Sequence, residues 1–338
     1  MLPTPRACGL EQSRTMSKLS KPWRLVIKAA FSAIAIGGLI AGINWRELPE
    51  LINGYHWEFA GAAFIGLMIQ FPVSGLKWHA ALRVCNVDVS PTRLTRFYCI
   101  SHFVGQFLPT SIGGDAYRVY RVLPLVQPRS RAVTSIVLDR IVGLAALLVL
   151  GAVGAVFLID NFRLPQGYLM ALAVGCLGAV VGSAAMYFGW FRLLRKKLQH
   201  LKVVAAIQGD LMQLLRAGWK WVPLLGMAFV FQLIAVAIVY LLFLGAGSSI
   251  GLAEVALIAA VTGLAGMIPL AINGIGVTEG TITLAGVALG ADYEDAAVAA
   301  VLLRVVVLPL SCACGVLYWR EPHGRDADVS TRRPAIPA

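Results

Sequence analysis

The chain has 338 residues, of which 58% are hydrophobic and 14% charged, and its mean hydropathy is +0.76. This composition excludes a water-soluble enzyme. The 29 Lys and Arg residues outnumber the 17 Asp and Glu residues. However, the basic residues lie between apolar blocks of bilayer-crossing length instead of on one polar face, which argues against nucleic-acid binding.

Long apolar blocks predict an all-α polytopic membrane protein with about six transmembrane helices, because roughly 20 apolar residues suffice for a helix to cross the hydrocarbon core. A basic cytoplasmic segment is expected at 1–24, a transmembrane domain at 25–319 and a disordered cytoplasmic tail at 320–338. The basic segment 192–220 is expected to lie in the cytoplasm or on the anionic inner leaflet. The predicted spans are 25–43, 59–76, 133–158, 168–191, 222–246 and 296–319.

Two further apolar stretches, 97–113 and 255–290, are interrupted by Pro and Gly. Lys and Arg are retained on the cytoplasmic side of a membrane. The first stretch has basic flanks and the second has acidic flanks, so we expect two re-entrant hairpins that enter from opposite sides and leave both termini in the cytoplasm. Eight ordinary spans are the alternative.

The two interruptions have similar sequences: LPTSIGG at 108–114 and IPLAING at 268–274. Weak internal similarity at interrupted hydrophobic segments is typical of transporters built from inverted repeats. Pro ends or kinks a helix, and Gly allows backbone conformations that other residues avoid. The alternative is a kink within an ordinary span. The residues expected to form the re-entrant breaks are Pro109, Gly113, Gly114, Pro269, Gly274 and Gly276.

Four charged residues fall deep inside apolar stretches: Asp139, Arg140, Glu279 and Arg304. A charge at the bilayer centre costs at least about 2.5 kcal/mol, so it normally faces a bundle interior or a wet cavity and has a partner. We expect Asp115 to pair with Arg140, and either Asp139 or Glu279 to pair with Arg304. The predicted gating network of charges consists of Asp115, Asp139, Glu279 and Arg304.

Arg118 and Arg121 follow the first interruption, three residues apart on one side of a short helix that begins near Asp115. Arginine binds phosphate oxygens with two parallel hydrogen bonds. We therefore predict that Arg118, Arg121 and Arg140 bind an anionic lipid headgroup. The alternative for the first two is a cytoplasmic loop that follows the usual distribution of positive charge.

Catalysis has almost no support in the sequence. It contains no glycine-rich phosphate loop, no metal-binding constellation and no serine nucleophile elbow. We expect no enzymatic activity, no cofactor and no bound metal.

Three motifs, FLPTSIGGDAYR (Phe107–Arg118), the Asp139-Arg140 pair and IPLAINGIGVTEG (Ile268–Gly280), resemble the transmembrane flippase-like domain of lysylphosphatidylglycerol synthases. The resemblance covers roughly residues 25–320. It departs from the family pattern at Asp115, where Glu is frequent, and at Ile272 and Asn273, where Pro and Gly are usual. The matching residues are Pro109, Gly114, Arg118, Arg140, Pro269, Gly274, Gly276 and Glu279.

The resemblance implies movement of a lipid or a lipid-linked glycan between leaflets. The soluble aminoacyl-transferase domain of the full-length synthases is absent from this sequence, so lysyl transfer is not expected. The leading hypothesis is a lipid flippase of the bacterial inner membrane whose partners are membrane lipids, either an anionic phospholipid or a prenyl-linked glycan, with the headgroup passing through a polar cavity at the membrane midplane. Two alternatives are an ion-coupled carrier of a small anion, and a non-transporting subunit that supports a glycosyltransferase or hopanoid-pathway enzyme.

Overall fold

The computed structural model describes residue 37 and residues 53–107, 112–161, 217–267 and 274–320. Regular structure in these ranges is entirely helical. The predicted spans 25–43 and 168–191 lie outside the described residues, except Gly37, which is helical. Most of the basic segment 192–220 also lies outside them.

Four of the described helices are long and apolar enough to cross a membrane. Each has 25 or more residues, hence a length of at least about 38 Å against a hydrocarbon core of about 30 Å. Four predicted spans are thereby confirmed, and the protein is polytopic. The long helices are α3 (Trp57–Val84), α6 (Ser130–Asn161), α9 (Trp221–Gly245) and α12 (Tyr293–Trp319).

Large apolar side chains on the outer faces of these helices are exposed. Ile65 of α3, Val156 of α6, Leu233 of α9 and Val305 of α12 are each more than half exposed. Many exposed large apolar side chains are unfavourable in water and suit contact with lipid chains.

Four shorter helices lie between the long ones: α4 (Pro91–Phe107), α5 (Ile112–Val122), α10 (Leu252–Met267) and α11 (Val277–Ala288). Their 11 to 17 residues correspond to about 17–26 Å, which is less than the hydrocarbon thickness. α4 packs against α5, and α10 packs against α11. Each pair flanks one of the predicted interruptions, whose prolines Pro109 and Pro269 lie outside the described residues.

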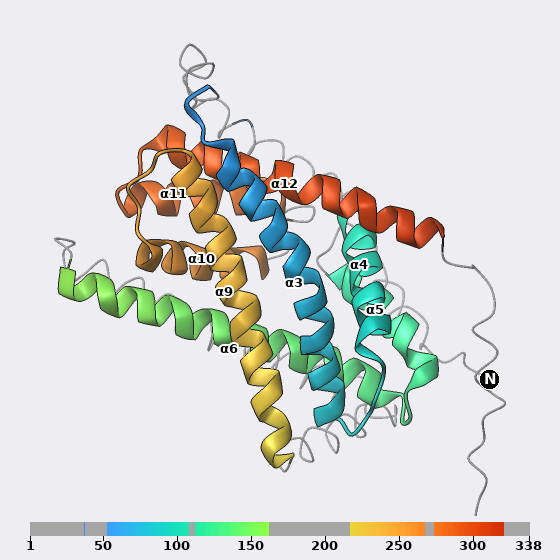
Figure 1. Ribbon diagram of the computed structural model, residues 1–338. Helices are drawn as coiled ribbons and strands as arrows, with labels where there is room; N and C mark the ends of the chain where they lie inside the picture. Colours follow the sequence, from blue (N-terminus) through green and yellow to red (C-terminus); the bar gives the residue numbers. More distant parts are fainter. Residues whose placement is uncertain (1–36, 38–52, 108–111, 162–216, 268–273, 321–338) are drawn as a thin grey trace, which may run out of the picture.

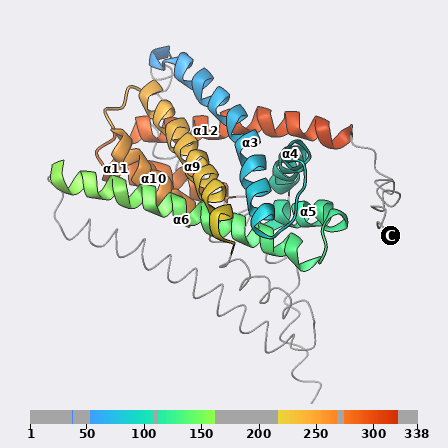
Figure 2. The ribbon, with the colours of Figure 1, turned by 60° about the horizontal axis from the view of Figure 1, so that its bottom comes forward.

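The described helices therefore form two groups with the same order: long, short, short, long. The first group is α3–α6 and the second is α9–α12. The first residues of α3 and α9, Trp57 and Trp221, are 164 positions apart (221 − 57), and the other three corresponding helices begin at nearly the same spacing. Their chain directions are opposite: α3 and α9 lie side by side and antiparallel, and α6 and α12 also run in opposite directions (Figures 1 and 2).

The contacts between the two groups also correspond to one another. The first group's α6 packs against the second group's α10, and the second group's α12 packs against the first group's α4. Gly151 of α6 leaves no room for a side chain beside Ala260 of α10, and a Cβ on Gly315 of α12 would lie 2.6 Å from the Phe103 ring of α4. Gly151 and Gly315 are also 164 positions apart, so both seams depend on a glycine at the corresponding place.

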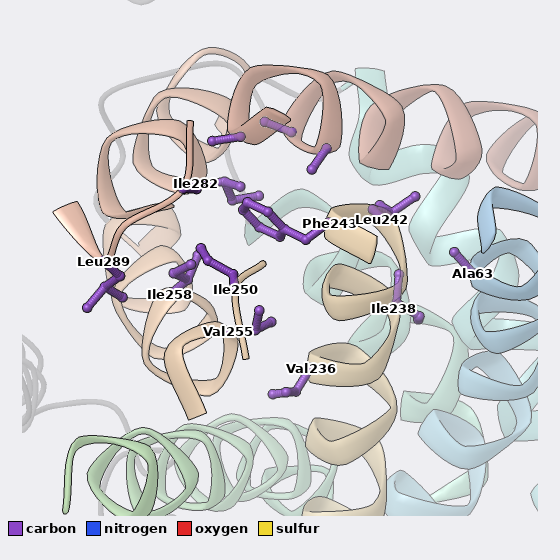
Figure 3. Packing of buried hydrophobic residues seen from close by; sticks show 14 of the residues in the cluster. Ala63, Val236, Ile238, Leu242, Phe243, Ile250, Val255, Ile258, Ile282 and Leu289 are labelled. Carbon is purple, nitrogen blue, oxygen red and sulfur yellow. The ribbon is translucent and has the colours of Figure 1, made fainter. Parts of the chain in front are cut away.

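The apolar core of the second group lies against α3. Figure 3 shows side chains from α9, including Val236, Ile238 and Phe243, together with Ile258 of α10 and Ile282 of α11. A second cluster around Trp78 joins α3, α4, α5 and α6 and includes Leu224 and Ala228 of α9. These two cores fix the helices whose polar residues form the site described next.

Candidate functional site

A cavity of about 500 Å³ lies between the two groups. The first group contributes charged and polar lining from α3, α4, α5 and α6, and the second group contributes mostly apolar lining from α9 to α12. The ionisable lining residues other than His and Tyr are Lys77, Asp115, Arg118, Asp139 and Arg140.

Asp139 of α6 lies between two cations. Its Oδ2 accepts a hydrogen bond from Arg118 Nη2 at 3.0 Å, and its Oδ1 lies 3.2 Å from Lys77 Nζ. The three side chains are 4%, 3% and 9% exposed, respectively. A buried carboxylate requires such partners, because desolvation of an unpaired charge costs several kcal/mol.

Arg118 is held on several sides. Its Cζ lies 4.3 Å from the ring centroid of Trp78 and 5.2 Å from that of Tyr98, which are cation–π distances. Trp78 is itself fixed, because its Nε1 donates to Ser135 Oγ at 3.2 Å. Arg118 Nη1 donates to Asp115 Oδ1 at 3.3 Å, whereas Nε has no acceptor among the described residues.

Arg140 closes the exposed side of this cluster. Its Nη2 lies 2.7 Å from Asp115 Oδ2 and its Nε donates to the same oxygen at 2.8 Å. The Arg140 side chain is 44% exposed. The predicted pairing of Asp115 with Arg140 is confirmed.

A second, separate ion pair joins Glu279 of α11 to Arg304 of α12. Arg304 Nε donates to Glu279 Oε1 at 2.6 Å, while Glu279 Oε2 accepts from the backbone N–H of Gly276 at 2.7 Å. The carboxylate therefore caps α11 and binds Arg304 together. Gly276 has φ +86° and Gly274 has φ +71°, a region that favours glycine.

The two ion pairs occupy corresponding places. Asp115 and Arg140 are 25 residues apart, and so are Glu279 and Arg304. In each pair the carboxylate lies in the short helix after an interruption and the arginine lies in the following long helix. Of the two predicted partners for Arg304, the structure selects Glu279.

The rest of the cluster has no counterpart in the second group. At the spacing of 164 residues, Arg118 corresponds to Ile282 and Asp139 corresponds to Leu303. Both apolar residues also line the cavity. The charged lining residues therefore lie in the first group, and the corresponding lining of the second group is mostly apolar.

The charges of the cavity do not cancel. Its described lining contains three cations, Lys77, Arg118 and Arg140, and two carboxylates, Asp115 and Asp139. With histidine counted as neutral, the sum is +1. Because the cluster is largely buried, this excess charge favours the binding of an anion.

The predicted headgroup residues separate into two classes. Arg118 and Arg140 line the cavity, whereas Arg121 lies over the Phe97 ring, with its Cζ 4.8 Å from the centroid, and is not among the lining residues. Gly114 lines the cavity, and a Cβ there would lie 2.8 Å from Ser101 O. Gly113 is buried.

Sequence reasoning missed Lys77. The predicted span ended at residue 76, which placed Lys77 in a basic cytoplasmic loop, but α3 continues to Val84 and buries this side chain. Trp78, Ala80, Ala81 and Leu82, which are all buried, continue the apolar pattern after the lysine. That pattern was the available signal.

The family model described as "Lysylphosphatidylglycerol synthase TM region" matches residues 25–315. A UPF0104 membrane protein of Methanothermobacter thermautotrophicus is 22% identical over 314 residues, which cover 86% of this chain and 93% of that protein. The family match includes both groups of helices and every charged residue of the cavity. The chain is therefore a multi-pass membrane protein and belongs to the family of lysylphosphatidylglycerol synthase transmembrane regions.

Proposed function

We propose that this protein is a lipid transporter of the bacterial plasma membrane that moves an anionic headgroup between leaflets without altering it chemically. The observation that carries the proposal is the cavity of about 500 Å³, whose charged lining has one more cation than carboxylates. Lys77, Arg118 and Arg140 supply the donors for a phosphate oxygen.

The opposite wall favours a lipid over a free small anion. Ile282 and Leu303 of the second group lie where the first group has Arg118 and Asp139. Val239 and Ile258 extend the apolar lining of the second group. Such a cavity binds a ligand that has a charged end and an apolar end. A carrier of a small soluble anion would not require the apolar lining of the second group.

The paired arrangement of the helices supports transport. Groups of the same order and opposite direction, each containing a broken pair of short helices, are typical of inverted-repeat transporters, whose substrate sites lie between the repeats. Under this proposal α4–α5 and α10–α11 are re-entrant hairpins. The ion pairs Asp115–Arg140 and Glu279–Arg304 hold the hairpins to the adjacent spans and form the gating network.

The distribution of basic residues sets the proposed orientation, with both termini in the cytoplasm. Lys77 is seven residues from the end of α3 and Asp139 is nine residues from the start of α6, which is about 10–14 Å along each helix. In this orientation those helix ends are cytoplasmic. The headgroup site therefore lies toward the inner leaflet, and the apolar part of the cavity extends toward the midplane.

Leaflet exchange in proteoliposomes tests the proposal. A tail-labelled fluorescent phosphatidylglycerol is added in trace amount, and dithionite bleaches the outer-leaflet probe. Wild-type protein should expose inner-leaflet probe to bleaching, whereas Arg118→Gln should reduce the rate at least about tenfold, a change of about 1.4 kcal/mol in the barrier. Arg129→Gln, in an exposed loop, is the matched control and should behave as wild type.

Equal bleaching in empty, wild-type and variant vesicles for every lipid tested would contradict the proposal. Uptake of a soluble anion without lipid exchange would favour the ion-coupled carrier. Absence of both lipid exchange and anion uptake in the wild-type protein, with copurification of a pathway enzyme, would favour the non-transporting subunit.

A further inference from the structure

We infer that the cavity selects a lipid whose headgroup is a single phosphodiester esterified to a neutral, hydroxylated alcohol such as glycerol. This inference rests on the proposed function and narrows its substrate class. It distinguishes such lipids from those with an amine in the headgroup and from those that end in a phosphomonoester.

The first argument is the charge balance. The formal charges of the described ionised residues that line the cavity sum to +1. One phosphodiester, which carries a single negative charge, neutralises this excess. A phosphomonoester carries about −1.5 to −2 at neutral pH and would leave excess negative charge at a buried site. That excess is unfavourable for the same reason that an unpaired buried cation is.

The second argument is that both carboxylates already bind cations. Asp139 lies between Lys77 and Arg118, and Asp115 lies between Arg118 and Arg140. An ammonium group in the cavity would compete with these residues for the same oxygens and would be repelled by the net positive charge. The site therefore disfavours ethanolamine and aminoacylated headgroups.

The third argument is a set of neutral hydrogen-bonding groups that line the same cavity. Thr262 Oγ1 of α10 is buried and has no partner among the described residues. Gln232 uses its Nε2 to donate to Gly143 O at 2.8 Å, so its side-chain oxygen remains an acceptor. Both residues line the cavity, as does Ser101. Hydroxyl groups both donate and accept, which suits such a mixed set.

The lining of the cavity combines three kinds of groups. Charged donors lie on α3, α5 and α6, neutral polar groups lie on α4, α9 and α10, and apolar side chains such as Val239 and Ile258 complete the second group's wall. A lipid phosphodiester of a polyol has a matching part for each kind: the phosphate for the charged donors, the hydroxyl groups for the neutral polar groups and the acyl chains for the apolar side chains.

The test compares tail-labelled lipids that share their acyl chains but differ in headgroup. Phosphatidylglycerol is compared with phosphatidylmethanol, which keeps the phosphodiester and lacks free hydroxyls, and with phosphatidylethanolamine, lysylphosphatidylglycerol and phosphatidic acid. Wild-type protein should move phosphatidylglycerol at least about tenfold faster than each of the others, equivalent to about 1.4 kcal/mol in selectivity.

Thr262→Val separates hydroxyl recognition from charge recognition, because valine keeps the shape and removes only the hydroxyl. It should slow phosphatidylglycerol toward the rate of phosphatidylmethanol without altering the latter. Thr92→Val, at an exposed position of α4, is the matched control and should preserve the preference.

The outcomes are distinguishable. If no lipid moves faster than in empty vesicles, the proposed function fails. If lipids move but all headgroups move at similar rates, or the amine or phosphomonoester lipids are preferred, transport stands and this inference is overturned. The wild-type comparison requires no variant and decides the question even if Thr262→Val does not fold.

Discussion

Asp139→Asn is expected to destabilise the protein by about 3–5 kcal/mol, the usual cost of breaking a buried ion pair from one side. The amide keeps the shape of the carboxylate but removes the charge that faces Lys77 Nζ at 3.2 Å and Arg118 Nη2 at 3.0 Å. Arg118 retains Asp115 at 3.3 Å. Lys77, whose side chain is 9% exposed, is therefore the cation that loses its counterion.

The assay is the free energy of unfolding in mixed micelles, titrated with a denaturing detergent. Asp88→Asn is the matched control, because Asp88 is 84% exposed and its contact with His79 is long, at 3.9 Å. It should change the free energy by no more than about 0.5 kcal/mol. Combining Lys77→Met with Asp139→Asn should recover more than half of the loss, since it removes the stranded cation together with its counterion.

Two results would refute this reasoning. One is a loss below about 1 kcal/mol for Asp139→Asn, which would mean that the cluster is well hydrated instead of buried. The other is a double variant no more stable than the single one, which would show that Lys77 is not coupled to Asp139.

Three further substitutions test other parts of the site. Gly276→Ala is expected to cost about 1–2 kcal/mol, because φ is +86° there, whereas Gly280→Ala, in α11 with open space beside it, should be neutral or stabilising in the same titration. Arg304→Gln should cost about 2 kcal/mol, since it removes the cation from Glu279, which is 8% exposed; a loss no larger than that of Gly280→Ala would contradict it. Arg121→Gln should leave phosphatidylglycerol exchange within about twofold of wild type, because this side chain lies outside the cavity lining; a reduction as large as that of Arg118→Gln would contradict it.

Hydropathy alone predicted the four described long helices, because a bilayer requires long apolar runs and tolerates few charges within them. Hydropathy ended the first of these helices too early, at residue 76, because the lysine that follows lowers the local hydropathy whether it is buried or at the surface. Only the packing of α3 against α4 and α6 shows that this residue faces inward.

Part of the charge pairing could be predicted, because a charged side chain deep in the membrane requires a partner of opposite charge. Asp115 with Arg140 followed from that rule, and Glu279 with Arg304 was one of two alternatives. The role of Asp139 was not predictable, because its partners come from two other helices.

Internal similarity was visible only at the interruptions, where the two prolines are 160 positions apart (269 − 109). The ion pairs and helix starts show a spacing nearer to 164 residues, so the second interruption contains about four additional residues before its acidic residue. A comparison centred on the prolines therefore misaligns the following helices. It could not reveal that Arg118 and Asp139 correspond to Ile282 and Leu303.

Photolabelling measures directly whether a lipid lies across the two walls of the cavity. A phosphatidylglycerol with a diazirine in its acyl chain should label the cavity-lining residues Ile282 and Leu303, and the combined change of Lys77→Met and Arg118→Gln should remove this labelling. Leu284 and Val305, on the same helices, are 70% and 51% exposed and should be labelled equally in both proteins. Labelling confined to Leu284 and Val305, or cavity labelling unchanged when both cations are removed, would contradict the account.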